Sequence, residues 1–72
     1  MSLNCTDLIR IVNAGGELII DSKQYSANDL IKIANAISEK NHITLKNSEY
    51  FSTNDLIRIA NAGKGNIIFE IS

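Results

Sequence analysis

The sequence predicts an α/β fold in which three αβ repeats form a short solenoid-like arc. One phrase, Asp-Leu-Ile-(Arg/Lys)-Ile-(Val/Ala)-Asn-Ala, begins at Asp7, Asp29 and Asp55, and each copy is followed by a short run rich in β-branched residues. A repeat of this kind usually marks one supersecondary unit that stacks on its own copies to cover an apolar face. With 72 residues the chain is expected to be a single domain, residues 1–72, with repeats at about 4–22, 26–47 and 52–72.

Each phrase is preceded by a signal for the start of a helix. Asn4, Ser26 and Ser52 stand three residues before the three aspartates. Such side chains accept hydrogen bonds from the first free amides of a helix, and the aspartate faces the positive end of the helix dipole. A hydrophobic staple is also expected in every copy, pairing Leu3 with Leu8, Tyr25 with Leu30 and Phe51 with Leu56.

Apolar residues at i, i+3 and i+4 predict helices with one buried side. They are Leu8, Ile11 and Val12, then Leu30, Ile33, Ala34 and Ile37, then Leu56, Ile59 and Ala60. Gly15-Gly16 and Gly63 are expected to end the first and third helices, since glycine adopts the left-handed conformation without strain. The copies begin 22 and then 26 residues apart, so the middle helix is expected to be longer, running through Ile37 to about Lys40 and stopping at Asn41.

The runs at 18–20, 43–45 and 67–71 are predicted strands. Strands joined through helices run parallel, with right-handed crossovers. Alternation places one set of side chains against the helices: Leu18, Ile20, Ile43, Leu45, Ile67, Phe69 and Ile71.

The side chains that point away from the helices predict the strand order. They form three lateral rows, Glu17/His42/Asn66, Ile19/Thr44/Ile68 and Asp21/Lys46/Glu70. Only with the second strand in the middle does the last row alternate in charge, which favours neighbouring strands. We therefore expect a three-stranded parallel sheet in the order 1-2-3, with three helices on one face and the other face open.

This helix-and-strand pattern resembles the coils of leucine-rich-repeat proteins of the ribonuclease-inhibitor kind. Residues 43–47 share only the middle of the L-x-x-L-x-L-x-x-N consensus. The segment from Ser52 to Asn66 is more similar to short, functionally uncharacterised bacterial proteins that carry related phrases. The resemblance covers most of the chain and implies a fold, but it carries over no catalytic residue.

Composition narrows the classes of partner and compartment. The net charge is −1, which gives no electrostatic reason to bind nucleic acid or an anionic membrane. The one cysteine, Cys5, needs no oxidising compartment, and the sequence shows neither a signal peptide nor an apolar stretch of membrane-spanning length. A cytoplasmic protein is the expectation.

No residue set in the sequence predicts catalysis, a cofactor or a metal site. Cys5 near a helix start could form a thiolate, but nothing places His42 beside it, and these two residues cannot supply a four-ligand zinc site. Gly63-Lys64-Gly65 follows a helix instead of leading into one, so it is interpreted as a turn and not as a phosphate loop.

Polar positions that recur in every copy are interpreted as structural. Asn13, Asn35 and Asn61 lie near the helix ends, where asparagine satisfies free carbonyls or could form a ladder between repeats. The i, i+3 pairs Asp7/Arg10, Asp29/Lys32 and Asp55/Arg58 are expected on the solvated side of each helix.

The open sheet face is the candidate site. Its interaction residues are Ile19, Thr44, Ile68, Asp21, Lys46 and Glu70. An exposed apolar strip commonly marks a contact surface, although single surface isoleucines need no explanation. The edge strands, the absence of proline and the small core also favour a homodimer or higher oligomer.

The sequence leaves three functions open. The leading one is a non-enzymatic interaction module that associates with itself or another protein through the open sheet face or an edge strand. The alternative is a dedicated inhibitor, such as an immunity or antitoxin-like protein that blocks a partner enzyme. The third is a thiol enzyme acting through Cys5.

Overall fold

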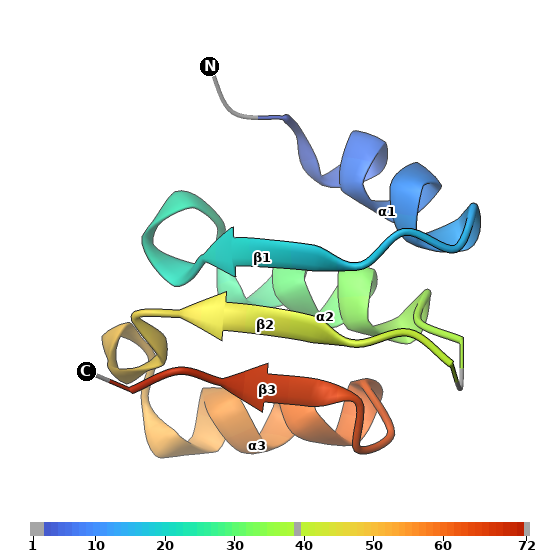
Figure 1. The fold of residues 1–72 in the computed structure, drawn as a ribbon. Helices are drawn as coiled ribbons and strands as arrows, with labels where there is room; N and C mark the ends of the chain where they lie inside the picture. Colours follow the sequence, from blue (N-terminus) through green and yellow to red (C-terminus); the bar gives the residue numbers. More distant parts are fainter. Residues whose placement is uncertain (1–2, 39, 72) are drawn as a thin grey trace.

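The computed structural model describes residues 3–38 and 40–71. Three helices and a three-stranded sheet make up the molecule; in Figure 1, α2 and α3 lie behind the strands and α1 lies above β1. A short 3₁₀ turn leads from each of the first two strands into the next helix. The elements in chain order are α1 (Cys5–Asn13), β1 (Leu18–Asp21), η1 (Ser22–Gln24), α2 (Ala27–Asn35), β2 (Ile43–Lys46), η2 (Ser48–Tyr50), α3 (Thr53–Ala62) and β3 (Ile67–Phe69).

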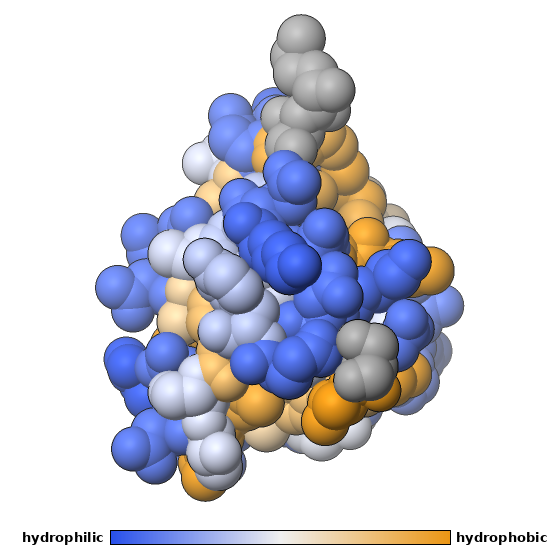
Figure 2. Space-filling view, turned by 90° about the vertical axis from the view of Figure 1, so that its left-hand side faces the viewer, coloured by the Kyte–Doolittle hydropathy of each residue, from blue (hydrophilic) through white to orange (hydrophobic). Residues whose placement is uncertain are grey.

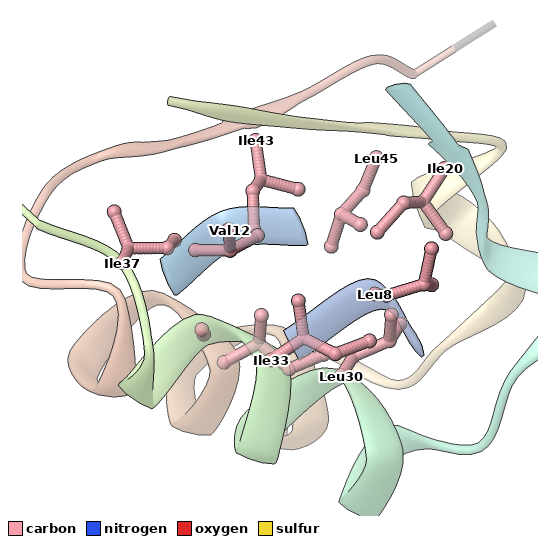
Figure 3. Packing of buried hydrophobic residues seen from close by; sticks show 10 residues of the cluster. Leu8, Val12, Ile20, Leu30, Ile33, Ile37, Ile43 and Leu45 are labelled. Atoms are coloured by element: carbon pink, nitrogen blue, oxygen red, sulfur yellow. The ribbon is translucent and has the colours of Figure 1, made fainter. Parts of the chain in front are cut away.

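The sheet is parallel with the order β1-β2-β3, which confirms the predicted topology. Ile19 pairs with Thr44, and Thr44 pairs with Ile68, so the predicted middle row is confirmed as a row across all three strands. In Figure 3 the helices lie on one side of the strands, and Leu8 and Val12 of α1 share the core with Leu30 and Ile33 of α2. The prediction of one covered face and one open face is therefore confirmed.

Side-chain caps begin all three helices as predicted. Asn4 Oδ1 accepts the Asp7 amide at 2.8 Å, Ser26 Oγ accepts the Asp29 amide at 3.2 Å, and Ser52 Oγ accepts the Asp55 amide at 3.3 Å. Each cap satisfies one of the amides that an α-helix leaves without an internal partner.

The core lies between the two layers. In Figure 3 Ile20, Ile43 and Leu45 extend from the strands toward Leu30 and Ile33 on α2, with Leu8 and Val12 from α1 beside them. Tyr25 and Phe51, predicted as staple residues, pack against this cluster, whereas Leu3 is half exposed.

The middle helix is shorter than predicted. α2 ends at Asn35, as α1 ends at the equivalent Asn13, and Ala36 is its C-cap. The extra residues before β2 form a connection instead of further helical turns, and part of the predicted extension, Glu39, lies outside the described residues. The prediction was wrong because Ile37 is buried from within this connection, so its apolar character does not require a continued helix.

Gly63 ends α3 for a reason other than the one predicted. Its φ is −84°, which every residue type can adopt, and Lys64 and Gly65 take the positive φ angles of 54° and 86°. A Cβ at position 63 would overlap Cγ1 of Ile67, so close packing explains the glycine there. The left-handed conformation predicted for the first stop does occur, at Gly15 with φ 98°.

β3 is also shorter than predicted, because it ends at Phe69 and Ile71 does not join the core. The side chain of Ile71 is 67% exposed. Backbone pairing with the preceding repeat nevertheless continues past the strand, since the Glu70 amide donates to Leu45 O at 2.9 Å and the Ser48 amide donates to Glu70 O at 3.1 Å. The last predicted residue of the third repeat, Ser72, lies outside the described residues.

Candidate functional site

The sheet face that the helices leave bare carries an exposed aliphatic pair. Ile19 is 75% exposed and Ile68 is 50% exposed, with the half-buried Thr44 between them in the same row. A shallow hollow of about 430 Å³ lies over this row, and its lining is Glu17, Leu18, Ile19, His42, Thr44 and Ile68. The structure thus brings the three middle-row candidates of the sequence together at one surface.

One polar row borders this hollow at the amino ends of the strands. The Glu17 carboxylate accepts the His42 backbone amide at 2.9 Å, and His42 Nδ1 lies 3.3 Å from the same oxygen, Oε2. Both side chains are more than half exposed. Glu17 therefore ties the chain before β1 to the chain before β2 without leaving the surface.

The second polar row lies at the carboxyl ends of the strands. Asp21 pairs with Lys46 in the register of the sheet, as predicted. Its carboxylate Oδ1 is, however, hydrogen-bonded to the Lys23 amide at 3.0 Å and to Asn47 Nδ2 at 3.1 Å. The Lys23 amide, and next the Asn47 amide, hold the pKa of Asp21 below its ordinary value of 3.8.

Asn47 is a structural residue that the sequence reasoning missed. It stands in the left-handed conformation, with φ 58°, directly after β2. Asparagine adopts this conformation more readily than most residues, and an Asn directly between a strand and a turn is the signal that could have indicated it. Through Asp21 it connects the ends of β1 and β2.

Figure 2 looks onto the end of the molecule where the strands finish, which is the left-hand side of Figure 1. Hydrophilic atoms cover much of this end, with hydrophobic atoms beside and below them. Lys46 and Glu70 of this row are exposed, whereas Asp21 is half-buried.

The two residues considered for thiol chemistry lie in different parts of the fold. Cys5 opens α1 in the helix layer, and its Sγ lies 3.6 Å from the backbone oxygen of Asp29 on α2. His42 precedes β2 and bonds to Glu17. Burial, aided by the Asp29 carboxylate, raises the pKa of the Cys5 thiol, which is the opposite of what an activated nucleophile requires.

The repeated polar positions on the helices are mostly solvated. Asn13, Asn35 and Asn61 are all exposed. Of the three predicted i, i+3 pairs, Asp55 and Arg58 approach to 3.7 Å. Two asparagines that do form hydrogen bonds between repeats lie in the connections between helix and strand. Asn41 Nδ2 donates to Gly16 O at 3.4 Å, and Asn66 Nδ2 donates to Ser38 O at 3.1 Å.

Gly63, Lys64 and Gly65 form a turn, which agrees with the prediction. A hollow of about 410 Å³ beside this turn is lined by Ile37, Ser38, Gly63, Lys64 and Asn66. Lys64 is the one charged residue of that lining.

Residues 3–38 and 40–71 contain no group of three or more histidine, cysteine or carboxylate side chains that could hold a metal ion. Within the same ranges, no helix has the length and apolar character needed to cross a bilayer.

Comparison with known proteins gives no match. No protein-family model, no curated protein and no solved structure matches this chain.

Proposed function

We propose that this protein is a small, non-enzymatic interaction module of the cytoplasm that associates with itself or with another protein through surfaces its own helices leave uncovered. The observation that carries the proposal is the bare face of a parallel sheet. Parallel sheets are usually covered on both faces, because their crossover helices pack on both sides. Here all three helices lie on one side, and Ile19 and Ile68 remain exposed on the other.

The chemistry of the bare face suits a protein partner. Its middle row has two isoleucines on either side of a threonine, and its outer rows are polar, which is the usual arrangement of a largely apolar contact with a hydrated rim. The rim carries three carboxylates, on Glu17, Asp21 and Glu70, against the single ammonium group of Lys46. A partner segment with aliphatic residues flanked by basic ones would match this face.

Replacing Ile68 with Lys tests the proposal. The variant should lose association while its far-UV circular dichroism stays unchanged, because Ile68 is half exposed and contributes little to the core. Asn35→Lys is the matched control, since it adds the same charge to an exposed residue of the opposite layer. Association that survives Ile68→Lys unaltered would exclude this surface.

A dedicated inhibitor is the second candidate, and the excess of carboxylates on the bare face favours it. Such a protein would cover a basic site on one enzyme. Thr44→Lys places a cation at the centre of the face and should abolish a complex of this kind. Retention of a purified enzyme complex by the Thr44→Lys variant would contradict inhibition through this face.

A thiol enzyme is the remaining alternative, and it would require Cys5 to be more reactive than a free cysteine. The raised pKa predicts that iodoacetamide at neutral pH alkylates Cys5 more slowly than a free cysteine, because less thiolate is present. Mass spectrometry after a limiting dose measures this directly. Alkylation faster than that of free cysteine would favour the enzyme.

A further inference from the structure

The helix layer has two ends, α1 and α3, and at each end an isoleucine is more exposed than its equivalents in the other copies of the repeat. The third residue of the repeated phrase is Ile9 on α1, Ile31 on α2 and Ile57 on α3. Ile9 and Ile31 are partly buried against the core, whereas Ile57 is 52% exposed. The contact of Cys5 on this side of α1 with the backbone of Asp29 shows that the side faces the next helix.

The fifth residue of the phrase shows the same loss of burial at the α1 end. Ile33 on α2 and Ile59 on α3 are fully buried, but the equivalent Ile11 on α1 is only partly buried. The third and fifth positions lie two residues apart, about 200° around a helix, so they face opposite neighbours. Ile11 thus lies on the face of α1 that would contact a preceding helix, and the described residues contain no such helix.

Each end therefore presents one half of an interface that the chain already forms twice. α1 packs on α2, and α2 packs on α3, in the same orientation (Figure 1). The α3 end offers Ile57 with the uncharged neighbours Thr53, Asn54, Ala60 and Asn61. The α1 end offers a hollow of about 410 Å³ lined by Leu3, Asp7, Arg10 and Ile11.

We infer that a second copy of this chain packs head to tail, with the α3 end of one copy in the α1 end of the next. The inference rests on the proposed function, names a second copy of the chain as the partner, and assigns the contact to the two ends of the helix layer instead of the bare sheet face. The sheets would join in the register used within the chain, placing Ile68 beside Ile19 of the next copy. Because the two patches differ, each copy keeps one free end, and growth continues past two copies until a ring closes or a filament forms.

The joined sheets would carry one unfavourable contact. The register that places Ile68 beside Ile19 also places Glu70 beside Asp21 of the next copy, and like charges on adjacent strands repel. Glu70→Gln removes this repulsion and should raise the association constant by up to about fivefold. A contact between two α3 helices related by two-fold symmetry would not predict this gain.

Complementation between variants tests the inference. Ile57→Lys blocks the α3 end, and Leu3→Lys blocks the α1 end; both residues are about half exposed, so the fold should tolerate the change. Each variant alone should have the mass of one 7.9 kDa chain at concentrations where the wild type associates, a loss of at least about tenfold in affinity. An equimolar mixture should form a complex that stops at two chains, because one intact end of each kind remains.

Thr44→Lys separates this inference from association through the bare sheet face. Thr44 lies on β2, away from both ends, so the variant should assemble like the wild type. Assembly that is lost in Thr44→Lys and kept in Ile57→Lys would overturn the inference while supporting the proposed function. A mixture that stays monomeric, or a wild type that stops at two chains, would overturn the head-to-tail geometry. A wild type that is monomeric throughout would remove self-association by either surface.

Discussion

At the scale of single residues, two serines in equivalent turns occupy different hydrogen-bonding environments. Ser22 and Ser48 open η1 and η2, and neither is exposed. Ser48 Oγ donates to Leu45 O at 2.6 Å, whereas Ser22 Oγ has no hydrogen-bond partner among the described residues. A buried hydroxyl without a partner costs free energy, so the two positions should respond differently to the same substitution.

Alanine at the two positions should change stability in different ways. Ser48→Ala should lower the free energy of unfolding by about 1 kcal/mol, because it removes a buried hydrogen bond. Leu45 O keeps the Glu70 amide as a donor, which limits the loss. Ser22→Ala should leave stability unchanged or raise it. Urea denaturation of both variants measures the difference, and equal losses would contradict the assignment of partners.

Asp21 should make stability depend on pH in the acidic range. Its pKa is lower in the folded protein than its ordinary value of 3.8, so its contribution is complete above that value and is lost as the pH falls through the folded pKa. The wild type should therefore exceed Asp21→Asn in stability most at neutral pH, and the gap should shrink below about pH 4. Denaturation midpoints across this range test the sign. A gap that widens on acidification would exclude a lowered pKa.

At the scale of elements, the helix starts and the strand order were predictable, because they depend on local sequence pattern and on the alternation of side chains along each strand. The three caps follow from Asn4, Ser26 and Ser52, and the strand order follows from the charges of the last polar row. The length of α2 was not predictable in the same way. Ile37 fits the helical period, but its burial from a connection depends on tertiary packing, which local periodicity does not encode.

The end of α3 offers a test of close packing. Gly63→Ala should destabilise the fold by about 1–3 kcal/mol, because the new methyl group overlaps Ile67. The same change in an Ile67→Ala background should cost less, since the overlapping atoms are gone. Urea denaturation of the four proteins in this cycle gives the coupling. Equal costs in both backgrounds would mean that the contact is not the cause.

At the scale of the whole molecule, the bare sheet face was predictable from the sequence, but the two uncovered ends of the helix layer were not. The alternation of Ile19, Thr44 and Ile68 with core residues was sufficient to place them together on the bare side. The loss of burial at Ile57 and Ile11 depends on which helices have neighbours, so it needed the three-dimensional arrangement. The bare sheet face and the uncovered ends both follow from the repeat, because each unit covers only its neighbours and the first and last units therefore each lack one neighbour.

The charge of the bare face should control its affinity for a partner. Lys46→Glu leaves the face with no positive side chain and should weaken binding to an acidic partner segment while strengthening binding to a basic one. Fluorescence anisotropy with two labelled amphipathic peptides of opposite charge measures the preference. A preference of the wild type for the acidic peptide would contradict the proposed partner chemistry.

The central claim is that uncovered surfaces of this fold drive association, and the solution mass over a dilution series tests it most directly. Light scattering should give a mass above the 7.9 kDa of one chain at high micromolar concentration, falling toward that value on dilution. A mass of one chain at every concentration would contradict self-association.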